Sequence, residues 1–298
     1  MIMARVLNGS RGTQALAFAV CGLGRAGAAR VRDLQALAGV ELVATVSRRA
    51  GIGSHAWPQV LADPRITCVI VATENATHPQ FVGEALAAGK HVLCEFPLAP
   101  NGATARQLFA QARSAGLVLH TEFIGLLTQG HQWLRDQARQ PLARLDLGFT
   151  GDFHGWVESE ALAGHHATLA VARLHTLWDV LGPLQLQDAT LETSADGYRL
   201  VAELSTLAPR PGTAPPSARL IEVRARGLPR GRTLDLTFAD GTRAPAPPSE
   251  SHGGLFLRDL EWFCASVGQG AASYVSDEAV LGVLDLADAI TARIGQHP

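Results

Sequence analysis

Residues 16–27 read LAFAVCGLGRAG, an apolar run followed by the spacing Gly22-x-Gly24-x-x-Gly27. Such a run is typical of a buried strand, and the residues that follow have the periodicity of a helix. In a strand-to-helix turn, Gly22 permits the tight bend, Gly24 lets a pyrophosphate approach the backbone, and Gly27 lets helix and strand pack closely. The stretch therefore predicts a dinucleotide-binding fold, in preference to a glycine-rich turn with a structural role only.

On both sides of this motif, and as far as residue 121, short apolar runs alternate with helical patterns. We expect strands at residues 16–21, 41–46, 66–72, 91–95 and 117–120, and helices at residues 26–37, 78–88 and 104–115. Strands and helices in alternation require right-handed crossovers. This part of the chain is therefore predicted to be α/β, with a doubly wound parallel sheet of the Rossmann type.

Beyond residue 121 the predicted strands are longer and follow one another directly. We expect helices at residues 126–139, 166–181, 255–267 and 276–294, and strands at residues 142–149, 184–193, 198–207, 219–226 and 233–238. This order predicts an α+β domain with an open, largely antiparallel sheet. The predicted domains are a flexible tail at residues 1–13, a Rossmann domain for the dinucleotide at residues 14–122, and an α+β substrate and dimerisation domain at residues 123–298.

The composition of the 298-residue chain excludes several classes of protein. With 25 basic and 27 acidic side chains, the chain lacks the positive charge that generic nucleic-acid binding requires. Its apolar runs are far shorter than the roughly 20 residues that cross a bilayer. Cys21, Cys68, Cys94 and Cys264 follow no metal-binding or disulfide spacing. We expect a cytoplasmic protein with reduced thiols that binds neither nucleic acid nor membrane.

The end of the second predicted strand indicates which dinucleotide is bound. NAD enzymes usually place Asp or Glu there, roughly 20 residues after the glycine motif, to bind the ribose hydroxyl. This chain has Ser47, Arg48 and Arg49 instead. Guanidinium groups hold phosphate through charged hydrogen bonds of about 1.5–3 kcal/mol each. The sequence therefore predicts a preference for NADPH, whereas the alternative is a solvated, charged loop.

Polar residues also follow the third and fourth predicted strands. Ligands bind at the carboxyl ends of parallel strands, so we expect these residues to surround the nicotinamide half of the cofactor. The predicted cofactor-binding residues are Gly22, Leu23, Gly24, Arg25, Ala26, Gly27, Ser47, Arg48, Arg49, Thr73, Glu74, His78, Glu95 and Phe96.

Taken together, these motifs resemble a known superfamily over nearly the whole chain. The glycine motif, Ala72-Thr73 with His78, and Gly89-Lys90-His91-Val92-Leu93 before Glu95-Phe96-Pro97 resemble the glucose–fructose oxidoreductase and inositol dehydrogenase superfamily. Within it, Gly24-Arg25-Ala26-Gly27, Val46-Ser47-Arg48-Arg49, Val118-Leu119-His120-x-Glu122 and Arg173-Leu174 resemble the biliverdin reductases. The resemblance implies hydride transfer from NADPH to the central methine carbon of biliverdin, a linear tetrapyrrole, giving bilirubin. It also implies that the 2′-phosphate lies on residues 47–49.

The residues that would oxidise an alcohol are incomplete. Sugar dehydrogenases of the superfamily use a Lys, an Asp and a His, but here Phe96 and Val171 stand at the Lys and Asp positions and His175 alone remains. Losing such acid–base groups costs about 10²–10⁴-fold in rate. Two alternatives to biliverdin reduction stay open: reduction of another conjugated or carbonyl substrate, and a non-catalytic NADP-binding sensor.

The resemblance implies that Arg173 stands at the position of the arginine implicated as proton donor. Because a guanidinium stays charged at neutral pH, we expect Arg173 to stabilise negative charge on the substrate, or to donate a proton that water replaces. The alternative is an arginine in a surface ion pair. The predicted catalytic residues are Arg173, Glu95 and His175.

The strand predicted at residues 219–226 alternates Glu222, Arg224 and Arg226 on one face. If this face lines the cleft, Arg224 and Arg226 could bind the two propionates of a bilin; otherwise it is a half-buried sheet face or the interface of a homodimer. The predicted substrate-binding residues are Phe96, Glu122, Phe123, Arg173, Arg224 and Arg226. His165, His166, His175 and Asp179 lack a complete ligand spacing, so no metal site is predicted.

Overall fold

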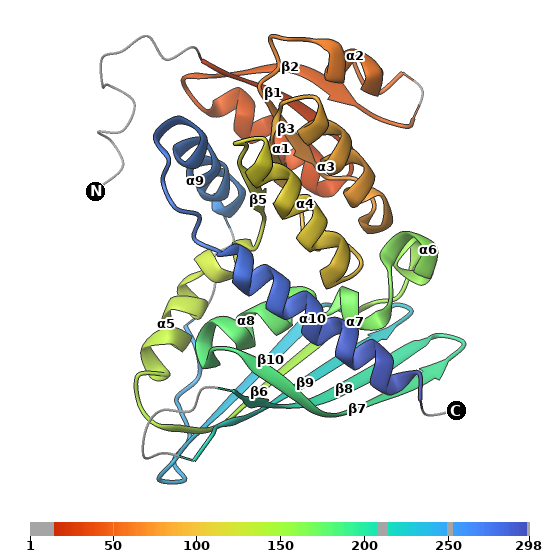
Figure 1. Cartoon of the computed structure of the whole chain (residues 1–298). Helices are drawn as coiled ribbons and strands as arrows, with labels where there is room; N and C mark the ends of the chain where they lie inside the picture. Colours follow the sequence, from red (N-terminus) through yellow and green to blue (C-terminus); the bar gives the residue numbers. More distant parts are fainter. Residues whose placement is uncertain (1–14, 50, 208–213, 249–252, 297–298) are drawn as a thin grey trace.

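The structure is a computed structural model that describes residues 15–49, 51–207, 214–248 and 253–296. Two sheets lie at opposite ends of the molecule, with helices between them (Figure 1). The predicted tail at residues 1–13 lies outside the described residues. Both predicted architectures, the parallel Rossmann sheet and the largely antiparallel second sheet, are confirmed.

The N-terminal sheet has the strand order β2-β1-β3-β4-β5, and all neighbouring pairs are parallel. Its strands are β1 (Leu16–Cys21), β2 (Val40–Val46), β3 (Cys68–Val71), β4 (His91–Cys94) and β5 (Leu119–Thr121). The order reverses at β1, so the carboxyl ends of β1 and β3 open on the crevice where such sheets bind ligands.

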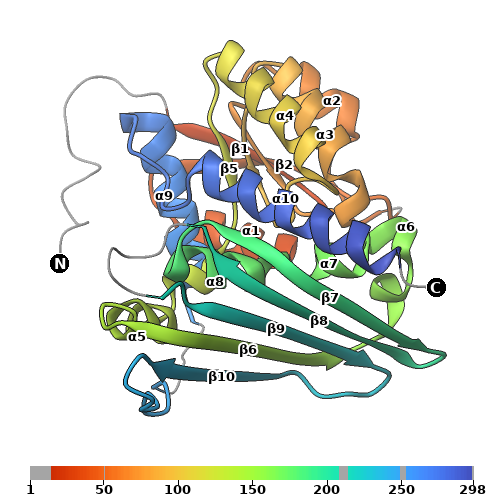
Figure 2. The same ribbon diagram turned by 60° about the horizontal axis from the view of Figure 1, so that its bottom comes forward.

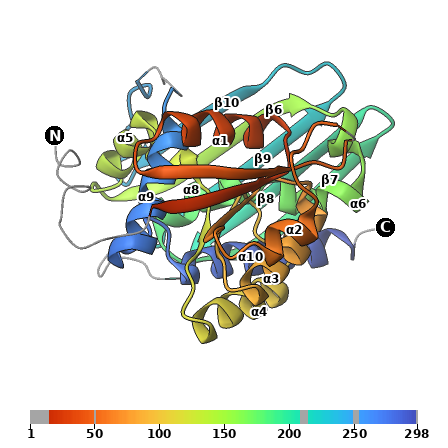
Figure 3. The same ribbon diagram turned by 90° about the horizontal axis from the view of Figure 1, so that it is seen from above.

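Helices cover both faces of this sheet. They are α1 (Arg25–Ala36), α2 (Trp57–Ala62), α3 (His78–Ala87) and α4 (Gly102–Ser114), joined by α9 (Leu255–Gln269) from the far end of the chain. Figure 3 shows α1 on one side of β1 and α3 and α4 on the other. Phe263 of α9 packs edge-on against Phe18 of β1, with ring centroids 6.1 Å apart. The C-terminal part of the chain thus completes the core of the N-terminal sheet.

The second sheet has the order β10-β6-β9-β8-β7, and its neighbours are antiparallel except for the parallel pair β6 and β9. Its strands are β6 (Leu142–Asp152), β7 (Leu184–Ser194), β8 (Gly197–Thr206), β9 (Ser217–Ala225) and β10 (Gly231–Phe238). Helices cover one face of this sheet: α7 (His166–Leu169), α8 (Val171–Leu181) and α10 (Asp277–Ile294). The helix predicted at residues 166–181 is thus divided at Ala170, and the one predicted at 126–139 is a 3-10 turn, Ile124–Leu127, followed by α5 (Gln129–Gln137).

Helix α10 lies along both halves of the molecule (Figure 2). Its Asp288 accepts a hydrogen bond from the backbone N–H of Gly102 at the start of α4 (2.9 Å), and its Asp285 pairs with Arg106 of the same helix. On its other side it packs against α8, α7 and β7. Among the described residues, no helix combines the length and the apolar character that a bilayer crossing requires.

Candidate active site

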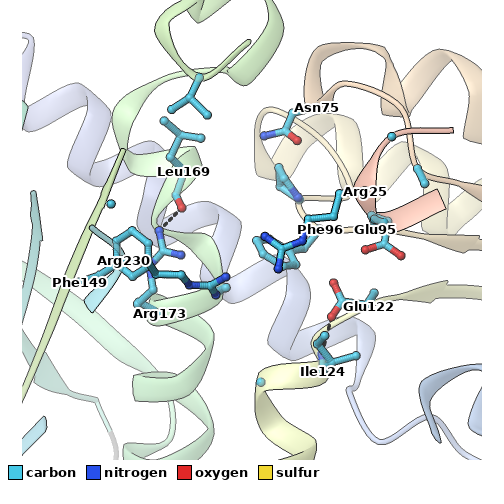
Figure 4. Close-up of a pocket in the computed structure, with 18 of the residues that line it drawn as sticks. Arg25, Asn75, Glu95, Phe96, Glu122, Ile124, Phe149, Leu169, Arg173 and Arg230 are labelled. Atoms are coloured by element: carbon cyan, nitrogen blue, oxygen red, sulfur yellow. Dashed lines mark hydrogen bonds between the residues drawn. The ribbon is translucent and has the colours of Figure 1, made fainter. Parts of the chain in front are cut away.

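A cavity of about 1610 Å³ lies between the carboxyl ends of the N-terminal strands and the helix-covered face of the second sheet. Its lining comes from the glycine turn and the ends of β2, β3, β4 and β5 on one side, and from β6, α8, β9 and β10 on the other. Figure 4 shows the two sides, with Arg25, Phe96, Glu95 and Glu122 facing the group formed by Phe149, Arg173 and Arg230.

The glycine turn has the geometry that a pyrophosphate needs. Gly22 has φ +93°, and a Cβ on it would lie 2.3 Å from the carbonyl oxygen of Ala72. A Cβ on Gly27 would lie 1.8 Å from the carbonyl oxygen of Gly22, whereas one on Gly24 would meet no atom within 4 Å. Gly24 precedes the first turn of α1, whose N–H groups receive no side-chain cap. The turn is therefore closed on its inner side and open toward the cavity, where helix N–H groups can bind an anion.

Ser47, Arg48 and Arg49 line the cavity where β2 ends. The backbone N–H of Arg49 donates to Ser47 Oγ (3.1 Å), which fixes the turn. Arg48 pairs with Glu74 from the end of β3, and its side chain is 68% exposed. An exposed ion pair of this kind is worth about 0–1 kcal/mol, so a phosphate can readily replace Glu74 as the partner of Arg48.

Behind the predicted nicotinamide region, Arg30 of α1 is completely buried. Its Nε donates to Glu95 Oε1 (2.8 Å), its Nη2 to Asp259 Oδ2 (2.5 Å) and its Nη1 to the carbonyl oxygen of Phe256 (2.9 Å). One buried cation therefore holds a carboxylate from each half of the chain. Although burial favours the neutral acid, Arg30 and His120 hold the pKa of Asp259 well below its ordinary value.

Glu122 lies next to this ion-pair network and lines the cavity. It is 1% exposed; its Oε1 accepts the N–H of Ile124 (2.5 Å), and its carboxyl lies beside that of Glu95 (Figure 4). Burial, followed by the charges of Glu95 and Asp259, raises the pKa of Glu122 well above its ordinary value. Burial also raises the pKa of Glu95, although Arg30 opposes this shift.

The opposite side of the cavity is rich in arginine. The guanidinium carbons of Arg173, Arg224 and Arg230 lie 4.5, 5.0 and 5.9 Å from the centroid of the Phe149 ring. The buried carboxylate of Glu222 pairs with Arg173 and accepts a hydrogen bond from Arg224 Nε (2.7 Å). Burial and the charges of neighbouring arginines lower the pKa of Arg230. The region is a positively charged site around an aromatic ring, suited to a planar anion.

Known proteins are similar to this chain in sequence and in fold. Residues 16–123 match the oxidoreductase family with an NAD-binding Rossmann fold, GFO/IDH/MocA. The chain is 31% identical to biliverdin reductase A of Mus musculus over 285 residues, and 30% identical to that of Homo sapiens over 286 residues. Both alignments cover 91% of this chain and 93% of the relative. The chain belongs to the biliverdin reductase family.

Solved structures of known proteins have a fold similar to that of this chain. Biliverdin reductase from Synechocystis sp. PCC 6803, in complex with biliverdin and NADP⁺, has a TM-score of 0.81 and 23% identity, covering 94% of this chain and 99% of the other. GenD2 from gentamicin A biosynthesis, in complex with NAD, has a TM-score of 0.78 and 19% identity, covering 97% of each chain. The predicted resemblance is confirmed, and the chain is an NAD(P)-dependent oxidoreductase of the biliverdin reductase type.

Most of the residues predicted to bind ligands or to act in catalysis line the cavity, but Gly27, Phe123, His175 and Arg226 do not. Phe123 is buried; its ring stacks on Phe96 (centroids 5.7 Å apart) and contacts the ring of His175 (4.0 Å). His175 therefore lies behind two phenylalanine rings, where burial lowers its pKa to about 4. Of the predicted catalytic groups, Arg173 and Glu95 reach the cavity.

Arg226 is displaced because β9 ends one residue before it, at Ala225. The alternation that places Glu222 and Arg224 on the cavity side does not continue, and Arg226 pairs with Glu158 (2.8 Å). The short connection to β10 supplies Arg230 instead, which the strand pattern could not indicate.

Arg30 was also missed, although the sequence carried a signal for it. Gly27 and Leu34 mark the buried face of α1, and Arg30 lies between them on that face at helical spacing. A charged residue on an apolar helix face must have a buried partner, which here comes from residues far away in the sequence.

Proposed function

We propose that this protein is an NADPH-dependent biliverdin reductase that gives bilirubin by hydride transfer to the central methine carbon. The observation that carries the proposal is that one cavity joins the dinucleotide turn to the arginine-rich site around Phe149. A bilin is a planar, conjugated dianion, and this site offers three guanidinium groups gathered around the Phe149 ring. The curated relatives at about 30% identity support the same substrate.

In this proposal, different residues of the cavity bind the cofactor, bind the substrate and stabilise the charge that develops during reduction. When bound, the reduced nicotinamide supplies the hydride. Gly22, Gly24 and the start of α1 bind the pyrophosphate, and Glu95 and Phe96 position the nicotinamide half. Arg224 and Arg230 bind the propionates. Arg173, held by Glu222, stabilises the negative charge that develops on the tetrapyrrole.

The cofactor preference follows from Ser47, Arg48 and Arg49. We expect Arg48→Ala/Arg49→Ala to raise the KM for NADPH by about 10- to 100-fold, because at least one charged hydrogen bond to the 2′-phosphate is lost. The KM for NADH should barely change. Arg65→Ala is the control, since Arg65 is an exposed arginine paired with Asp63 outside the cavity. Equal losses with both cofactors, or a wild-type preference for NADH, would contradict the assignment.

The substrate is tested by absorbance. Purified protein with NADPH and biliverdin should show loss of biliverdin, gain of bilirubin and oxidation of one NADPH per pigment. Oxidation of NADPH only with another conjugated or carbonyl compound would indicate the second candidate substrate class. Neither turnover nor tight pigment binding, in a protein that binds NADPH, would indicate the NADP-binding sensor.

Two further predictions stay proposals. The first is a homodimer that forms through the second sheet. Sedimentation of the purified protein would test it. The second is a cytoplasmic location, proposed because Cys21, Cys68, Cys94 and Cys264 follow no disulfide spacing.

A further inference from the structure

Three carboxyl groups lie around the guanidinium of Arg30 beneath the cavity, and two of them are bound to it. Arg30 donates to Glu95 and to Asp259, and both of these are therefore paired as anions. The hydrogen bonds of Arg30 do not include Glu122; Glu122 Oε1 accepts the N–H of Ile124, and its carboxyl lies beside that of Glu95 (Figure 4). A contact between two carboxyl groups is favourable only when one of them carries a proton, and Glu122 is the one without a cation.

Among the described residues, no hydrogen bond or ion pair joins Glu122 to a second cation. The titratable groups near it are Arg30 of α1, Cys94 and Glu95 at the end of β4, Asp259 of α9 and Tyr274 before α10, and His120 of β5 is bound to Asp259. His120 Nε2 and the Tyr274 hydroxyl are both bound to Asp259 Oδ1, at 2.8 and 2.6 Å. The direction of the pKa shift at Glu122 agrees with this arrangement.

Glu122 is also reachable from the substrate side. Glu95 and Glu122 both line the cavity, and Figure 4 shows their carboxyl groups pointing toward each other, next to Phe96. The opposite wall carries the guanidinium of Arg173. A neutral acid and a fixed cation thus lie on the two sides of the space assigned to the reacting pigment.

We propose that Glu95 and Glu122 share a single proton, held on Glu122, and that Glu122 is the catalytic acid of the reduction. This inference rests on the proposed function, which assigns stabilisation of the negative charge to Arg173 and names no proton donor. The hydride forms a C–H bond at the methine carbon, and the π electron pair moves onto a conjugated ring nitrogen. As the N–H bond forms there, the O–H bond of Glu122 breaks and leaves a carboxylate. Water in the cavity then returns one proton, so one proton is taken up per hydride.

The protonation state is tested without turnover. Infrared spectra of the ligand-free protein at neutral pH should contain the C=O band of a buried, protonated carboxyl, and Glu122→Gln should remove it. Glu95→Gln should make this band disappear at lower pH, because removing the neighbouring negative charge lowers the pKa of Glu122. Glu122→Gln keeps the size of the side chain and an oxygen for the N–H of Ile124. Absence of the band in the wild type, or its persistence in Glu122→Gln, would overturn the proposal.

The catalytic role is tested by kinetics. Glu122→Gln should lower kcat by about 10²–10⁴-fold with the Kd for NADPH unchanged. In the wild type kcat should fall as rising pH removes the proton; this alkaline limb should vanish in Glu122→Gln and move to lower pH in Glu95→Gln. Glu122→Asp, which keeps an acid, should restore part of the activity. Glu192→Gln, on an exposed side chain at the edge of the second sheet, is the matched control.

The two proposals fail in different ways. A wild-type protein that does not reduce biliverdin overturns the proposed function, while the infrared band still decides the protonation of Glu122. A wild-type protein that reduces biliverdin, together with a Glu122→Gln variant of normal kcat and pH profile, overturns the catalytic acid alone.

Discussion

Replacing Arg173 by alanine is expected to lower kcat for biliverdin reduction by about 10²–10³-fold and to leave the Kd for NADPH unchanged. The guanidinium lines the cavity and lies 4.5 Å from the Phe149 ring, on the side opposite Glu95 and Glu122. Reduction places negative charge on the pigment, and a fixed cation stabilises that charge more in the transition state than in the ground state. The loss should therefore fall mainly on kcat, which steady-state kinetics and single-turnover absorbance both measure.

The controls separate charge from packing. Arg173→Ala leaves the buried Glu222 paired with Arg224 and bound to the Tyr198 hydroxyl, so the variant should fold while its kcat stays low. Arg173→Lys should be intermediate, because lysine keeps the charge and loses the planar contact. Arg199→Ala, on the outer side of the sheet, should behave as the wild type. Near-normal turnover by the Arg173→Ala variant would show that Arg173 does not stabilise the transition state.

The second large effect concerns stability. Arg30→Met should lower the free energy of unfolding by about 3–5 kcal/mol, because it leaves the carboxylates of Glu95 and Asp259 buried without their cation. Arg30 holds the pKa of Asp259 below its ordinary value, so this stabilisation is present above the unfolded-state pKa and is lost as pH falls. The deficit of Arg30→Met should accordingly shrink in acid. Urea unfolding at several pH values measures it.

Two variants make the result specific. Arg106→Met removes an exposed ion pair with Asp285 and should cost about 0–1 kcal/mol. The triple variant Arg30→Met/Glu95→Gln/Asp259→Asn removes all three charges and should regain much of the lost stability, because uncharged groups no longer need a cation. A loss below about 1 kcal/mol in Arg30→Met would show that the network contributes little.

The sequence predicted the strands better than the site. The core strands β1 and β3 are buried on both faces, so each is an unbroken apolar run in the sequence. Such a run can be recognised without knowledge of the residues that pack against it. The six-residue helix α2 escaped prediction because it is too short to show a period. The parallel pairing of β6 with β9 inside a largely antiparallel sheet is a property of the topology, which local patterns do not contain.

The same distinction explains which site residues could be found. The glycine turn and the arginines after β2 are local motifs and were predicted with their places in the cavity. The ion pair between Arg30 and Asp259 joins residues 229 positions apart. The local sequence pattern around either residue does not indicate that the other one is its partner. Phe123 and His175 were predicted by family position, but packing of two aromatic rings places His175 outside the cavity.

Helix α10 has a consequence for how the molecule opens. Its Asp277, Asp285 and Asp288 bind α4, while its other side rests on α8 and β7. A rigid-body swing of the two halves would have to break these contacts together. The width of the cavity opening is therefore expected to stay constant. We expect the pigment to enter by diffusion, without a movement in which the two halves close around it. Truncation of the chain before Asp277, which removes α10, should likewise unfold both halves in a single transition. Neither half is therefore expected to fold alone.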